Sequence, residues 1–194
     1  NCINIGSISE SNSYAMNIGG IVGYSECNEY QIINCANNGD LKGNKYVGGL
    51  VGYNANTSKL SISNCVHLGF ITYSESAGGC FNSSVYDSSL CTLKYVYYND
   101  NDVGDNEHQA INMHNKCDYN TDTVFRLDVD KEDIYLFSDI SPYPEITCTI
   151  NSTDYKTVLN ALNAWIKWSE GGNDTNHETY KKWKYDANGK LAFE

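Results

Sequence analysis

The first half of the chain alternates short apolar runs with glycine and asparagine. Runs such as Ile18–Tyr24 and Val47–Tyr53 hold aliphatic and β-branched residues and are only a few residues long. This pattern is typical of short strands, because a helix would need a longer segment with a period near 3.6 residues. The sequence therefore predicts a strand-rich and turn-rich N-terminal half.

A repeat underlies these runs. The pattern N-C-x-x-x-G-x-[IL] begins at Asn1, Asn34 and Asn64, so successive copies lie 33 and 30 residues apart. A second block occurs between the copies of the first, as G-G-x-V-G-Y twice and then as G-G-C-F-N-S. The positions that define the repeat are Asn1, Cys2, Gly6, Gly19, Gly20, Asn34, Cys35, Gly39, Gly48, Gly49, Asn64, Cys65, Gly69, Gly78 and Gly79.

The period of about 30 residues predicts the architecture. A unit of this length with two or three short strands cannot bury its own apolar face, whereas stacked units share one core. We therefore expect a right-handed parallel β-solenoid of about three coils over residues 1–98. Equivalent side chains would stack, so that Asn1, Asn34 and Asn64 form an amide ladder and Tyr24 lies on Tyr53.

Cys2, Cys35 and Cys65 form a further predicted column. We interpret it as a ladder of small buried side chains; reactive or metal-binding thiols are the alternative. Neighbouring strands lie about 4.8 Å apart, which is within reach of a disulfide, so one bridge between adjacent coils is compatible with this column.

The two repeat blocks resemble the GLUG-motif repeats of large extracellular proteins of bacteria and parasitic protists. The resemblance covers residues 1–98 and is carried by the two G-G-x-V-G-Y copies and by N-C-x-N-x-G. It implies a secreted or cell-surface stalk or adhesin-like module and no catalysis in the repeats.

The C-terminal half, residues 99–194, has a different pattern. Strands are expected at Val124–Leu127, Ile134–Phe137 and Ile146–Ile150, and a hairpin from Trp183–Tyr185 to Leu191–Phe193 around Asn188-Gly189. Ser152–Trp168 carries apolar residues on one helical face, with Ser152 or Thr153 as the N-cap. We expect an α+β module that caps the exposed end of the stack.

Charge and cysteine content limit the classes of function that the protein can have. A net charge of −11 argues against binding to nucleic acid, and the sequence has no apolar run long enough to cross a membrane. Eight cysteines are typical of a secreted protein, and the sequons at Asn56, Asn82, Asn151 and Asn173 permit N-glycosylation. Because the chain starts at Asn1 without a signal peptide, we expect it to be a processed piece of a larger protein.

Candidate sites for chemistry are sparse. His67, expected at a solvent-facing position, and the other three histidines match no zinc pattern. Asp128, Asp130 and Asp139 are the candidate calcium ligands, with a solvated acidic loop as the alternative. The repeats hold no in-phase acidic stripe that a glycosidase would need.

These observations predict a non-catalytic, extracellular, adhesin-like interaction protein without a cofactor, forming the C-terminal part of a longer surface β-solenoid. Its partners would be protein or glycan ligands at a cell surface, or copies of itself. A carbohydrate-binding or glycan-processing β-helix module is the first alternative, although Trp165, Trp168 and Trp183 are expected in the core of the cap. A self-assembling filament subunit is the second.

Overall fold

The computed structural model describes residues 1–10, 12, 14–55, 58–73, 75–83, 91–99, 111–113, 124–128, 135–137, 147–173 and 179–194. Within these residues the fold is mainly β, with one α-helix, and in four of its sheets the strands pair in parallel, apart from one antiparallel strand at the end of the longest sheet. The strand-rich character that the sequence predicts is confirmed.

The repeat units contribute equivalent strands to the same four sheets. The longest sheet has the order β1 (Cys2–Asn4), β6 (Cys35–Asn37), β10 (Lys59–His67), β14 (Cys91–Asn99) and β16 (Val124–Asp128), and β5 (Glu29–Ile33) pairs with the first part of β10. The second sheet contains β2 (Ile8–Ser9), β7 (Leu41–Lys42) and β11 (Ile71–Thr72). The third contains β3 (Met16–Gly19), β8 (Lys45–Gly48) and β12 (Ala77–Gly78). The fourth contains β4 (Val22–Ser25), β9 (Val51–Asn54), β13 (Phe81–Ser83) and β15 (Ile111–Met113).

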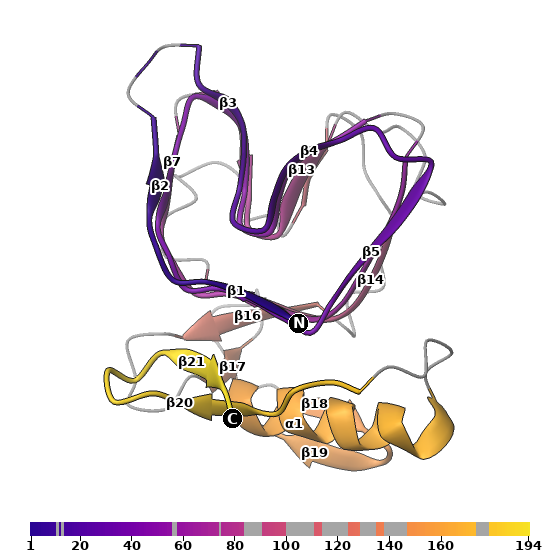
Figure 1. Cartoon of the computed structure of the whole chain (residues 1–194). Helices are drawn as coiled ribbons and strands as arrows, with labels where there is room; N and C mark the ends of the chain where they lie inside the picture. Colours follow the sequence, from indigo (N-terminus) through magenta and orange to yellow (C-terminus); the bar gives the residue numbers. More distant parts are fainter. Residues whose placement is uncertain are drawn as a thin grey trace.

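We call each pass of the chain through these sheets a layer. The first layer covers residues 2–33, the second 35–63 and the third 65–94. The second part of β14, from Val96, and β15 belong to a fourth layer, and β16 starts a fifth. Cys2 pairs with Cys35, and Ala36 with Val66, so Cys35 and Cys65 occupy equivalent positions in adjacent layers. Seen end-on, the layers superpose (Figure 1). The predicted register of the repeat is therefore confirmed.

The paired glycines allow close approaches inside each layer. β3 and β4 fold inward between two lobes, and their turn meets the wall formed by the longest sheet (Figure 1). A Cβ atom on Gly49 would overlap the ring of His67, and a Cβ atom on Gly19 would overlap the carbonyl oxygen of Val22. Only glycine fits at these two positions because backbone and ring already fill the space.

Apolar side chains fill both lobes and a third core outside them. One lobe contains Ile18, Leu41, Val47 and Ile71, and the other contains Leu50, Ile62, Cys65 and Leu93. The third core joins the outward side chains of the longest sheet to the C-terminal module, and includes Ala36, Val66, Tyr97, Leu162, Trp165 and Trp183. The expectation that Trp165 and Trp183 belong to a core is confirmed.

The C-terminal module contains two hairpins and the helix. β18 (Cys148–Ile150) pairs antiparallel with β19 (Thr153–Tyr155), α1 spans Val158–Trp168, and β20 (Trp183–Tyr185) pairs with β21 (Leu191–Phe193) as predicted. The predicted helix start at Ser152 is wrong. Asn151 and Ser152 have positive φ values of 49° and 61° and form a turn, so the N-cap is Thr157, without a side-chain hydrogen bond.

The module lies against the flank of the stack, which differs from the expected cover over its end. In Figure 1, α1 and the two hairpins lie below β1 and the equivalent strands behind it. Near the far end, β16 pairs with β14 and is followed by antiparallel β17 (Tyr135–Phe137). The apolar outer face of the longest sheet explains the flank position. Its side chains Ala36, Val66 and Tyr97 pack against the C-terminal module and are fully buried there.

Candidate functional site

A cleft of about 180 Å³ lies between the outer face of β5, β10 and β14 and the end of α1. Its wall consists of side chains in register on the three parallel strands. Ser61 pairs with Gln31 on one side and Thr92 on the other, and Ser63 lies between Ile33 and Lys94 in the same way. Since alternate residues of a strand share a face, the stacking aligns these polar groups in two parallel rows.

The opposite side of the cleft is aromatic. Trp165 and Trp168 line it from α1, where Trp165 is buried and Trp168 is half-buried. The ring of Tyr95 meets Trp168 edge-on, with 6.3 Å between the centroids and 60° between the planes. This arrangement exposes aromatic surface beside hydroxyl and amide groups.

Tyr95 has an unusual backbone conformation. It follows Asn34 and Asn64 in the same column, and the three residues have φ values of 54°, 50° and 55°. Asparagine adopts this left-handed conformation readily, whereas tyrosine does so at a cost of about 1–3 kcal/mol. Strain of this kind collects at functional sites. Burial raises the pKa of the Tyr95 hydroxyl, so it is a neutral hydrogen-bonding group in the cleft at neutral pH.

Asn173 lies at the end of the cleft, after the turn of Gly172, whose φ is 88°. Its side-chain amide donates a hydrogen bond of 2.8 Å to the carbonyl oxygen of Trp168. The bond fixes an exposed amide beside the Trp168 ring.

The predicted asparagine ladder holds the two sides of the cleft together. Nδ2 of Asn34 donates to Oδ1 of Asn1 at 2.6 Å, and Nδ2 of Asn64 donates to Oδ1 of Asn34 at 2.9 Å. The ladder also bonds the C-terminal module: Nε1 of Trp183 donates to Oδ1 of Asn34, and Nδ2 of Asn64 donates to the carbonyl oxygen of Leu162. Because α1 is attached in this way, the aromatic side of the cleft has a fixed position relative to the strands.

The predicted tyrosine stack is present at a second surface. The rings of Tyr24 and Tyr53 lie 5.5 Å apart and are within 6° of parallel, and Tyr46 packs on Tyr53 at 4.7 Å. The predicted stacking of Tyr24 on Tyr53 is confirmed.

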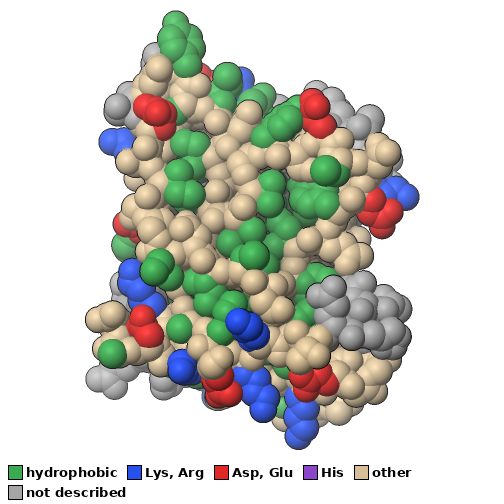
Figure 2. Space-filling model, viewed as in Figure 1, with side chains coloured by type: hydrophobic (Ala, Val, Ile, Leu, Met, Phe, Trp, Pro, Cys, Tyr) green, Lys and Arg blue, Asp and Glu red, His purple; other side chains and the backbone are tan. Residues whose placement is uncertain are grey.

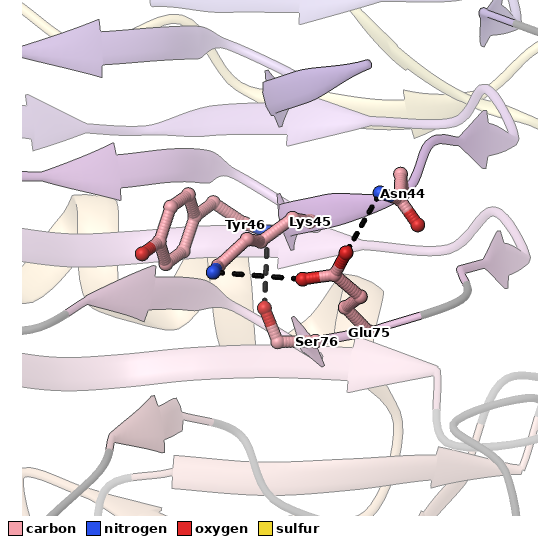
Figure 3. Close-up of polar contacts among 5 residues, drawn as sticks. All are labelled: Asn44, Lys45, Tyr46, Glu75 and Ser76. Atoms are coloured by element: carbon pink, nitrogen blue, oxygen red, sulfur yellow. Dashed lines mark hydrogen bonds and ion pairs between the residues drawn. The ribbon is translucent and has the colours of Figure 1, made fainter. Parts of the chain in front are cut away.

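A polar network that joins the second and third layers surrounds Tyr46 (Figure 3). Glu75 pairs with Lys45 at 3.5 Å and accepts a hydrogen bond from Asn44 at 3.0 Å, while Ser76 Oγ accepts one from the backbone N–H of Tyr46. Exposed ion pairs of this kind contribute little to the free energy of unfolding. We therefore infer that the network mainly keeps these two layers aligned with each other.

The column of cysteines contains thiols. Cys35 and Cys65 are buried, Cys2 is exposed, and the seven cysteines that the structure describes carry no disulfide. The bridge between adjacent coils with which the column was compatible is therefore absent among them. The hydrogen bond from Cys65 lowers the pKa of Cys35 to about 6, and burial raises that of Cys65 well above its usual value. The pair is shielded from solvent, as expected for a buried ladder.

His67 corrects an expectation. It is fully buried, and its Nδ1 lies 3.0 Å from the side-chain Nδ2 of Asn37. The Oδ1 of Asn37 in turn accepts a hydrogen bond from Nδ2 of Asn4. Burial lowers the pKa of His67 to about 4. The strand alternation would have placed it correctly, because His67 lies two residues after inward-facing Cys65. Asn4, Asn37 and His67 form a second polar column that the sequence analysis missed.

The remaining predicted sites fall partly outside the described residues. Asp130, Asp139 and the sequon at Asn56 lie outside them, Asp128 ends β16, and Asn82 lies in β13. Asn151 and Asn173 are exposed. In the described part of the chain, no group of three His, Cys, Asp or Glu side chains is placed to hold a metal, and no helix is long and apolar enough to span a membrane.

The cleft itself was not predicted. Ser61, Ser63 and Thr92 occupy alternate positions that mark an outward face, but their meeting with Trp168 depends on contacts about 100 residues apart in the chain. Comparisons with protein-family models, with curated proteins and with solved structures found no match.

Proposed function

We propose that this chain is a non-catalytic, extracellular, adhesin-like interaction module, built as the C-terminal part of a longer right-handed parallel β-solenoid. Two features of the fold support the architecture. Equivalent residues stack in register from layer to layer. In Figure 1 the chain, followed from β1, runs clockwise as successive layers recede from the viewer, which is the right-handed sense.

The observation that carries the proposal is the exposure of apolar side chains in the first layer. Ile8 is 38% exposed, whereas its partners in the next two layers, Leu41 and Ile71, are 1% and 3% exposed. Five of the six exposed large apolar side chains in the described part of the chain belong to this layer: Ile5, Ile8, Tyr14, Met16 and Tyr24. Figure 2 shows apolar side chains gathered on this end. Such an edge offers unpaired backbone groups to a further layer.

An extended chain tests the architecture. A second copy of residues 34–63 placed before Asn1 would reproduce the natural junction between Ser63 and Asn64. We expect the added layer to cover Cys2, which is now exposed, and to slow its alkylation by iodoacetamide at least tenfold, with a rise in melting temperature. The control carries Gly48→Val and Gly49→Val in the added copy, which cannot pack. Equal rates of Cys2 alkylation in the extended chain and in this control would rule out stacking at this end.

The extracellular assignment has a separate test. Secretion from eukaryotic cells should yield a chain whose intact mass falls on deglycosylation, with Asn151 and Asn173 as exposed acceptors. An unmodified secreted chain would count against glycoprotein character.

Self-association is the second candidate, because the same exposed edge fits a second copy. Light scattering should then give a molar mass that rises with concentration, and the extended chain should lower this tendency. A monomer at all concentrations would exclude this candidate while leaving the first intact.

A further inference from the structure

We propose that the cleft between β10, β14 and α1 binds a saccharide. One sugar ring would pack against Tyr95 and Trp168, and its hydroxyls would bond to Ser61, Ser63 and Asn173. This inference is independent of stacking at the open end, because the cleft is lined by outward side chains of β5, β10 and β14 and by the end of α1.

The size and chemistry of the cleft favour this ligand class. Its volume of about 180 Å³ is smaller than the roughly 300–1,000 Å³ typical of sites for drug-sized ligands, so it suits a single ring. A pyranose ring has an apolar C–H face and a polar rim. The cleft has the complementary arrangement, with aromatic surface on α1 and hydroxyl or amide side chains on the strands.

Tyr95 supplies a second, independent observation. The column contains Asn at the three preceding positions, and Asn suits both the left-handed backbone and the ladder. Tyr95 keeps the strained backbone and breaks the ladder, so that the buried Oδ1 of Asn64 lacks a hydrogen-bond partner. A residue that is costly for stability at this position, with its ring at a cleft, indicates a binding role.

The sugar has two candidate sources. One is a glycan on another molecule. The other is the first sugar of an N-glycan attached to Asn173, which begins the sequon Asn173-Asp174-Thr175 and lines the cleft. The N-glycosidic amide keeps one N–H, which is enough for the observed bond to the Trp168 carbonyl oxygen.

An array of immobilised oligosaccharides tests the first source. The protein is made in bacteria without glycosylation, and we expect binding that Tyr95→Asn and Ser63→Ala each weaken at least tenfold. The control Phe70→Asn removes an aromatic side chain that is 45% exposed and does not line the cleft, and it should leave binding unchanged. Melting curves of each variant exclude misfolding as the cause.

Acrylamide quenching of tryptophan fluorescence tests the second source. In protein secreted from eukaryotic cells, a glycan on Asn173 should shield Trp168, so that quenching is weaker than in Thr175→Ala, which lacks the sequon but keeps Asn173. Tyr95→Asn should abolish this difference. Array binding supports the first source, and shielding without array binding supports the second. If neither is seen, or if Tyr95→Asn affects neither, the cleft is not a saccharide site.

Discussion

Tyr95 lies in the column directly after Asn64, shares its left-handed backbone conformation, and leaves the buried Oδ1 of Asn64 without a hydrogen-bond partner. One layer back, Asn64 itself donates to Oδ1 of Asn34 at 2.9 Å. The amide ladder therefore ends where the candidate cleft begins, and stability and binding make opposite demands on position 95.

This relationship predicts that Tyr95→Asn stabilises the fold. The new amide would satisfy Asn64 Oδ1, worth about 1–3 kcal/mol, and would relieve strain, while loss of the Tyr95–Trp168 contact costs about 1 kcal/mol. We expect the free energy of unfolding in urea to rise by about 1 kcal/mol. Tyr95→Ala, which loses the ring without completing the ladder, should instead lower it. Equal destabilisation by both substitutions would contradict the ladder argument.

The buried His67 predicts a loss of stability in mild acid. Its pKa is about 4 in the folded protein against an ordinary 6.5, so the unfolded chain binds more protons between these values. The contribution is complete above pH 6.5 and declines as the pH falls to 4, by about 3 kcal/mol in total. Urea unfolding of wild type and His67→Asn across this range isolates it. Asparagine at position 67 continues the column of Asn4 and Asn37 and carries no charge, so parallel pH profiles would contradict the assignment.

Replacing the glycine at the sixth position of the repeat should cost different amounts of stability in the first and second layers. A Cβ atom on Gly39 would overlap the backbone of Gly6, whereas a Cβ atom on Gly6 has its nearest neighbour at 3.9 Å. Gly39→Ala should lower the free energy of unfolding by roughly 2–3 kcal/mol through overpacking, while Gly6→Ala should stay within about 0.5 kcal/mol. Similar effects at both positions would mean that the first two layers do not pack as described.

The periodic features of the sequence were the most predictable. The positions of Cys2, Cys35 and Cys65, and the stack of Tyr24 on Tyr53, follow from a repeat whose phase can be counted. Periodicity carries this information because a strand stacked in register repeats its neighbour's environment.

Features that depend on one local conformation or on distant contacts were harder to predict from the sequence. The helix was predicted to start at Ser152 because polar residues precede an apolar face, yet left-handed Asn151 and Ser152 turn the chain into a hairpin instead. The cleft requires Trp168 to meet Ser63, which only packing of the C-terminal module on the flank can arrange. No local pattern encodes that approach.

The last prediction concerns Asn34, whose side chain joins the layers to the C-terminal module. Its Nδ2 donates to Asn1 Oδ1 and to the carbonyl oxygen of Lys181, and its Oδ1 accepts from Asn64 and from Nε1 of Trp183 at 2.6 Å. Asn34→Ala removes the acceptor of the buried Trp183 indole N–H and one acceptor of Asn64, and it places alanine at a φ of 54°, so we expect a loss of about 3–4 kcal/mol.

A double-mutant cycle separates this role from a purely local one. Trp183→Phe removes the indole N–H while keeping an aromatic ring, and if the two side chains act through their hydrogen bond, the double variant should be less destabilised than the sum by about 1 kcal/mol or more. The matched control is Asn44→Ala, whose side chain donates a hydrogen bond to exposed Glu75 (Figure 3), and which should cost less than about 0.5 kcal/mol. Additive losses at Asn34 and Trp183 would mean that the hydrogen bond between these two side chains does not couple the ladder to the C-terminal module.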